Sequence, residues 1–201
     1  MSPNQSPAET GTTWTGAQLA HALWLALPPA ARGGPDLAAA AAAVKVSPRT
    51  VQRWLSGASR PTIEHAAALR ELIAPPAQAL RVQADEARWA REAATLIRAA
   101  RGRGVSPAWR AQGWHRPHLL QVLALPELQI HRVEVALADP VKAPSRGAWE
   151  VVSSRTYQNR PAALLAKHEL LEQYADRRVR IRPGLISKGQ HLCWLTGEDA
   201  R

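Results

Sequence analysis

Residues 41–57 read AAAVKVSPRTVQRWLSG, and this stretch decides how the first third of the chain is interpreted. Small and branched apolar residues alternate with polar ones in an order typical of two short helices that cross at a tight turn. Ser47 is expected to cap the second helix, and Pro48 stands at its first position, where a missing N–H costs nothing. This helix is predicted to run to about Ser56, where Gly57 ends it.

Small or apolar side chains occupy the positions that two crossing helices must bury. Ala41 lies four residues before Lys45, the expected turn residue, at a point where the helices touch and only a small side chain fits. The other positions expected to be buried are Ala40, Val44, Val46, Val51 and Trp54.

The flanking sequence completes an all-α N-terminal domain, predicted to span residues 14–75. Residues 1–13 are polar, contain two prolines and are expected to form a disordered tail. Helices are expected over about 15–27, 37–44, 48–56 and 61–73, with Thr15, Asp36 and Ser47 as N-caps.

This set of offsets, with its cap and turn, resembles the Cro/CI-type (XRE-like) helix-turn-helix of phage and bacterial repressors. The resemblance covers roughly residues 15–73, about a third of the chain. The sequence departs from the family's pattern at Lys45 and in the long loop over 28–36. Glycine is usual at the position of Lys45, because the resemblance implies a left-handed turn there, so Lys45 is expected to bear a strain of about 1 kcal/mol. The resemblance implies that the helix over 48–56 is a recognition helix that enters the major groove of DNA.

Burial of Val51 and Trp54 would leave the other side of this helix exposed. An arginine holds guanine O6 and N7 with two hydrogen bonds, and a glutamine holds adenine N6 and N7 in the same way. The residues expected to contact bases are Arg49, Gln52 and Arg53. Those expected to contact the DNA backbone, which fixes register without reading sequence, are Ser47, Thr50, Ser59 and Arg60.

After residue 75 the pattern changes to one long helix and then to mixed elements. A connecting helix is predicted over 76–104, with an apolar seam through Val82, Trp89, Ala93, Leu96 and Ala100. Residues 105–201 are predicted to form a small α+β domain, which makes the whole chain α+β. Its expected elements are helices over 117–123 and 161–174 and strands near 133–137, 149–156, 178–182 and 191–195.

The chain carries 26 Lys and Arg residues against 16 Asp and Glu, a net charge of +10. Such a charge attracts polyanions, which makes nucleic acid the natural partner. Only +2 of this charge lies in residues 1–75, and +8 lies in residues 76–201. The candidates for a second DNA-contacting or oligomerisation surface include Arg88, Arg91, Arg98, Arg178, Arg180 and Arg182. A solvated helix face, with Glu92 paired to Arg88, and a solvated edge strand explain the same arginines.

Eight tryptophans stand in a chain without phenylalanine, so most are expected to fill the core. A base-stacking role for Trp109 and Trp114 is the alternative.

Several classes of function lack their sequence signatures. The chain has no GxxxxGK[ST] or GxGxxG phosphate loop, and its histidines lack the partners of a metal site. The single Cys193 forms no intramolecular disulfide and fits a reducing cytoplasm. There is no signal-peptide pattern and no uncharged apolar run of about 18 residues. We therefore expect a cytoplasmic protein that is not an enzyme, holds no cofactor or metal and does not enter a membrane.

These features predict a sequence-specific regulator of transcription that binds double-stranded DNA. The resemblance implies a repressor of phage or mobile-element (immunity) type that occludes its operator. Two alternatives stay open: a DNA-binding accessory factor for replication, partition or excision, and a protein-interaction module that binds an acidic partner. The sequence is compatible with a homodimer and with a monomer whose two domains both contact DNA.

Overall fold

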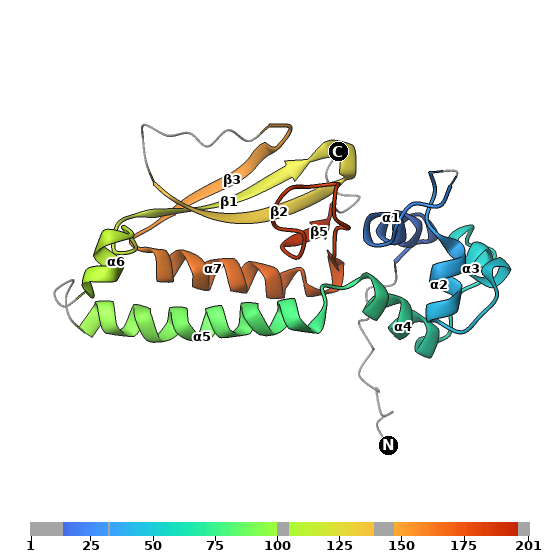
Figure 1. Ribbon diagram of the computed structural model, residues 1–201, viewed down its shortest axis with the longest axis horizontal. Helices are drawn as coiled ribbons and strands as arrows, with labels where there is room; N and C mark the ends of the chain where they lie inside the picture. Colours follow the sequence, from blue (N-terminus) through green and yellow to red (C-terminus); the bar gives the residue numbers. More distant parts are fainter. Residues whose placement is uncertain (1–13, 32, 100–104, 139–146, 197–201) are drawn as a thin grey trace, which may run out of the picture. The chain divides into compact units, whose positions relative to one another are not determined.

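The computed structural model describes residues 14–31, 33–99, 105–138 and 147–196, and Figure 1 shows its helices and strands. The chain divides into two compact units, Met1–Leu72 and Ile73–Arg201. In the described residues the first unit is helical, whereas the second combines helices with an antiparallel sheet. The predicted α+β class is therefore confirmed. The tail expected over residues 1–13 lies outside the described residues.

Helices of the described N-terminal unit follow the predicted order, and the first three begin at the predicted capping residues. They are α1 (Gly16–Ala26), α2 (Leu37–Ala43), α3 (Pro48–Leu55) and α4 (Ile63–Ile73), the last of which ends in the first residue of the second unit. Thr15 and Gln18 form a capping box, in which each side chain accepts a hydrogen bond from the other's backbone N–H. The side chain of Asp36 accepts a hydrogen bond from the backbone N–H of Ala39, and the side chain of Ser47 accepts one from that of Thr50.

The core of the N-terminal unit is made by the residues expected at the helix crossing. Ala40, Ala41, Val44, Val51 and Trp54 are all buried, and Val46 is half-buried. The first turn of α1 comes so close to the end of α3 that a Cβ on Gly16 would lie 2.3 Å from the carbonyl oxygen of Leu55. Only glycine fits at this contact, which fixes α1 against the carboxyl end of α3.

The second unit has three layers in Figure 1: a sheet, a helix packed on one face of the sheet, and a long outer helix packed on that helix. The outer helix is α5 (Ala77–Ala99), the inner one is α7 (Arg160–Gln173), and a short α6 (Pro107–Ala111) follows α5. The strands are β1 (His118–Leu125), β2 (Ile130–Leu137), β3 (Glu150–Tyr157), β4 (Arg178–Val179) and β5 (Cys193–Leu195), in the order β3-β1-β2-β5-β4. Leu120, Val133, Leu171 and Trp194 form the core between sheet and α7.

Two of the elements predicted for the second unit are corrected by the structure. The helix expected over 117–123 is wrong, because these residues begin strand β1. This strand is buried on both faces, so its apolar residues run together without the alternation that reveals a half-exposed strand. The strand expected over 178–182 contains only Arg178 and Val179, although Ile181 is still buried and its N–H donates to Gln190 O.

The apolar seam predicted for α5 is also wrong in part. Val82 and Leu96 are 63% and 62% exposed, whereas Ala87, Ala90 and Ala93 are buried on the side that packs against α7. Small side chains let two helices approach closely, so close packing on α7 decided which face is covered. Ala100 lies outside the described residues. The predicted connecting helix is therefore one layer of the second unit.

An ionic cluster joins α5 to α7. The Glu86 carboxylate on α5 accepts hydrogen bonds from Lys167 Nζ and from His168 Nε2, the latter over 3.1 Å. Burial acts to raise the pKa of Glu86, but the hydrogen bonds and charges of His168 and Lys167 outweigh it and lower this pKa to about 2. Both partners are buried, and the ionised Glu86 balances the positive charge of Lys167.

A tryptophan cluster joins α5 to α6 and the loop after it. Trp89 of α5 meets Trp109 edge-on with ring centroids 5.5 Å apart, and Trp114 with centroids 5.2 Å apart. Trp109 and Trp114 are themselves 6.2 Å apart. These three half-buried rings are thus packed against each other, and this packing holds the segment over 106–117 on α5.

Among the described residues, no helix is long and apolar enough to span a bilayer.

Candidate nucleic-acid interface

The turn between α2 and α3 has the left-handed residue that the sequence predicts. Lys45 has a φ of 57°, and Val46 N–H donates to Ala41 O over 3.0 Å to close the end of α2. Because the Lys45 side chain is exposed, its packing does not impose the left-handed backbone conformation. The strain of a left-handed L-residue, about 1 kcal/mol, is therefore stored at this turn.

Replacing Lys45 with glycine is expected to stabilise the N-terminal unit by up to about 1 kcal/mol, because glycine adopts a positive φ without strain. Lys45→Ala is the matched control, since it removes the same charge and keeps the strain. Thermal unfolding of both variants measures the difference. An equal melting temperature for the two variants would contradict the left-handed turn.

Helix α3 has one buried face and one polar, exposed face. Val51 is fully buried, and Trp54 is 5% exposed with its ring 5.3 Å from that of His65. The three residues expected to contact bases are all exposed: Arg49, Gln52 and Arg53. Their spacing of three and four places them on one side of the helix, opposite the anchored side. The structure therefore brings the predicted base-contacting residues together.

The predicted backbone-contacting residues surround this face but differ in how free they are. Ser47 Oγ accepts the N–H of Thr50 and lies 2.9 Å from Thr50 Oγ1, so both hydroxyls are already engaged in capping α3. Ser59 is half-buried, and its N–H donates to Arg53 O over 3.3 Å. Arg60 is exposed and is the cation of this set.

The positive charges around α3 are not neutralised within the described chain. Lys45, Arg49, Arg53 and Arg60 are exposed, and among the described residues no carboxylate forms an ion pair with any of them. Asp36 is used as the cap of α2. The side chains that project from α3 therefore present donors and positive charge to an incoming anion.

The arginines proposed for a second surface on α5 have different surroundings. Arg88 pairs with Asp85, three residues before it, over 2.8 Å, and not with the expected Glu92. Arg91 is exposed. The side chain of Arg98 lies outside the described residues.

The segment over 178–182 is less accessible than a solvated edge strand. Arg178 Nη2 donates to Gln83 Oε1 over 2.7 Å and to His191 O over 2.8 Å, and burial lowers the pKa of this guanidinium. The Nε atoms of Arg178 and Arg180 are buried, and Arg182 is half-buried. Arg178 is therefore half-buried and ties β4 to α5.

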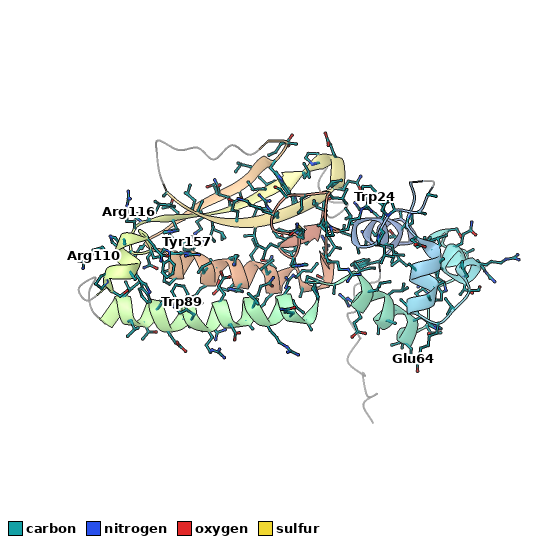
Figure 2. All side chains as sticks on the ribbon, in the orientation of Figure 1. Trp24, Glu64, Trp89, Arg110, Arg116 and Tyr157 are labelled. Carbon is teal, nitrogen blue, oxygen red and sulfur yellow. The ribbon has the colours of Figure 1, made fainter. Side chains whose placement is uncertain are left out.

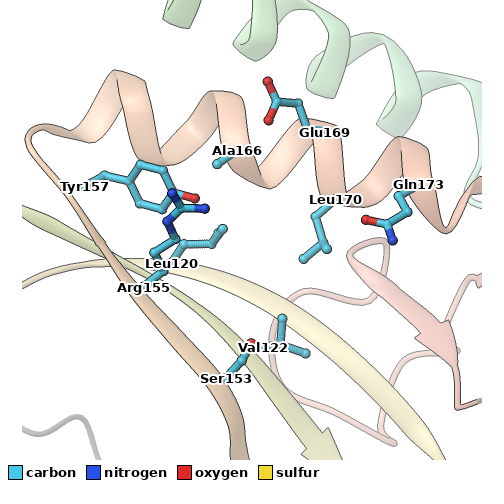
Figure 3. A pocket seen from close by; sticks show the side chains of 9 residues that line it. All are labelled: Leu120, Val122, Ser153, Arg155, Tyr157, Ala166, Glu169, Leu170 and Gln173. Carbon is cyan, nitrogen blue, oxygen red and sulfur yellow. The ribbon is translucent and has the colours of Figure 1, made fainter.

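A cavity of about 320 Å³ lies between α7 and the strands β1 and β3 (Figure 3). Its floor is apolar, with Leu120, Val122 and Leu170, whereas Arg155 and Glu169 bring opposite charges to its rim. The Arg155 guanidinium lies 5.3 Å from the centre of the Tyr157 ring. Sequence reasoning missed this cavity because three separate elements line it.

Comparison with known proteins gives no relative for this chain. No family model, no curated protein and no solved structure matches it significantly. The function must therefore be argued from the residues and their geometry.

Proposed function

We propose that this chain is a sequence-specific regulator of transcription that binds double-stranded DNA and reads it with α3. The observation that carries this proposal is the polar face of α3. Arg49, Gln52 and Arg53 share an exposed side without ion pairs, while Val51 and Trp54 hold the opposite side in the core. A recognition helix in the major groove needs this arrangement, with one face packed in the core and polar side chains directed at the base edges.

The side chains of α3 supply the two amino-acid types that read bases most specifically. Arg49 or Arg53 would hold a guanine through O6 and N7, and Gln52 would hold an adenine through N6 and N7. Arg60 and the hydroxyl of Ser59 would fix the helix on the phosphates, together with the one hydroxyl of the Ser47–Thr50 pair that does not donate to the other. The short, capped helix positions these donors without ordering a loop, which lowers the entropic cost of binding.

Regulation would follow from occupancy, because α3 lying in an operator blocks access of polymerase to the promoter. This mechanism needs no cofactor and no catalytic group. It operates equally for a dimer on a symmetric site and for a monomer on an asymmetric one.

Selection from a library of random-sequence duplexes tests the proposal. We expect the full chain to enrich one motif, and its affinity for that motif to fall steeply with salt, with a log–log slope of roughly −0.9 per phosphate contact. A promoter that carries the motif should lose transcription when the protein is added. Failure to enrich any motif, with binding that hardly changes with salt, would contradict the proposal and favour a protein-interaction module. A motif without transcriptional effect would favour an accessory DNA-binding factor.

A further inference from the structure

The +8 charge of residues 76–201 is not explained by α3, and the arginines of the second unit differ in whether they have partners within it. Arg88 and Arg132 are paired with Asp85 and Glu134, and Arg178 donates inside the unit. A different set lies where α6, the loop after it and the start of α7 meet. This set, called the α6 surface, consists of Arg110, His115, Arg116 and Arg160.

The α6 surface is formed by two segments that hydrogen bonds hold together. Arg160 N–H donates to Trp114 O over 2.9 Å, and the Arg160 guanidinium lies 4.6 Å from the centre of the Trp114 ring. Arg116 N–H donates to Gly113 O, which turns the chain toward β1. Figure 2 shows Arg110 and Arg116 at the end of the second unit that carries α6, and Trp89 nearer the middle of α5.

The surface is rigid as well as charged. The mutual packing of Trp89, Trp109 and Trp114 fixes the loop that carries Arg110 and Arg116, and cation–π contact orients Arg160. Arg110, His115 and Arg116 are exposed on this support. Fixed guanidinium groups lose less conformational entropy when they bind an anion than mobile ones do.

No carboxylate of the neighbouring sequence offsets this charge. Residues 93–126 contain no Asp or Glu, and neither do residues 151–168, which lead through β3 into α7. Among the described residues, none of Arg110, Arg116 and Arg160 forms an ion pair. The pKa of the buried His118 is lowered by burial, and the positive charges of Arg160 and Arg116 lower it further.

We propose that the α6 surface binds the phosphate backbone of duplex DNA and is a second contact of the same chain with its site. The proposal rests on the function proposed above. Guanidinium groups match phosphate oxygens with paired donors, and a surface of a single charge sign suits a uniformly charged backbone. Such contacts add affinity and fix position without reading sequence, so the motif is set by α3 and the second unit strengthens its binding.

The test is a salt titration of the full chain with the double variant R110A/R116A, on the selected motif and on a random-sequence duplex. Because two phosphate contacts are lost, the log–log slope is expected to become shallower by about 1.8 on both duplexes, with the selected motif unchanged. The control R81A/K188A removes the same charge from exposed residues of the second unit that lie outside the α6 surface, and should keep the wild-type slope. Near-UV circular dichroism checks that the tryptophan cluster is intact.

The outcomes separate this inference from the proposed function. A wild-type slope for R110A/R116A, or an equal change in R81A/K188A, overturns the α6 surface and leaves the role of α3 standing if the motif is still enriched. A shallower slope for R110A/R116A alone, in a protein that enriches no motif, supports the α6 surface and overturns sequence-specific reading by α3. Absence of any binding to duplex DNA overturns both.

Discussion

The variant Glu86→Ala is expected to destabilise the second unit by about 3 kcal/mol, the largest loss of stability predicted for a single exchange in this chain. Its carboxylate accepts hydrogen bonds from Lys167 and His168, which are buried in the α5–α7 interface. Without it, the charge of Lys167 stays buried and uncompensated. Urea unfolding followed by tryptophan fluorescence measures the loss, because most tryptophans lie in this unit.

Acid should produce the same loss in the wild type. The pKa of Glu86 is lowered from 4.5 to about 2 in the folded chain, so its contribution is complete above pH 4.5 and is lost as the pH falls toward 2. That shift corresponds to roughly 3 kcal/mol. The control Asp85→Ala removes a neighbouring carboxylate whose pair with Arg88 is exposed, and should change stability by less than about 0.5 kcal/mol. Equal stability of the Glu86 and Asp85 variants at neutral pH would show that the cluster is not stabilising.

The variants Gln52→Ala and Arg53→Ala are expected to weaken binding to the selected motif by about 1–3 kcal/mol each, or roughly 5-fold to 150-fold. Both side chains are exposed and lie outside the core of α3, so the loss should not come from unfolding. Gln52 carries no charge, and its removal should leave binding to random duplex nearly unchanged. Fluorescence anisotropy on the two duplexes measures both affinities.

Arg60→Ala is the matched control for these two variants. Arg60 is exposed beyond α3 and is expected to contact phosphate, so its loss should weaken specific and random binding by the same factor. If Gln52→Ala behaved like Arg60→Ala, Gln52 would not contact a base.

The N-terminal unit was largely predictable because its signals are local. A capping side chain accepts a hydrogen bond from a backbone N–H three residues later, as for Thr15, Asp36 and Ser47. The left-handed turn that the resemblance implies falls at Lys45, whose φ of 57° matches that expectation. The exposed face of α3 follows from the burial of Val51 and Trp54.

The second unit was less predictable because its contacts join distant residues. Glu86 meets Lys167 and His168 across 81 and 82 positions, and no pattern along the chain pairs them. The same holds for the close approach of α7, which buries the alanines of α5 and leaves Val82 and Leu96 exposed.

The surroundings of Arg178 depend on distant residues in the same way. The alternation of Arg178, Arg180 and Arg182 suggested an exposed face, but Gln83 of α5 accepts from Arg178 and fixes it inside the unit. The α6 surface does leave a trace in the sequence, since residues 93–126 lack any acidic residue. The net charge of the whole unit does not indicate where its positive charge is concentrated, whereas a long run without Asp or Glu does.

Repeating the library selection with Gln52→Ala and with Arg53→Ala tests most directly whether α3 reads DNA sequence. We expect each variant to enrich the wild-type motif with base preference lost at one or two adjacent positions and kept elsewhere, because each side chain reads its own base pair. An unchanged motif in both variants, or loss of preference spread evenly over all positions, would contradict the assignment of α3 as the recognition helix.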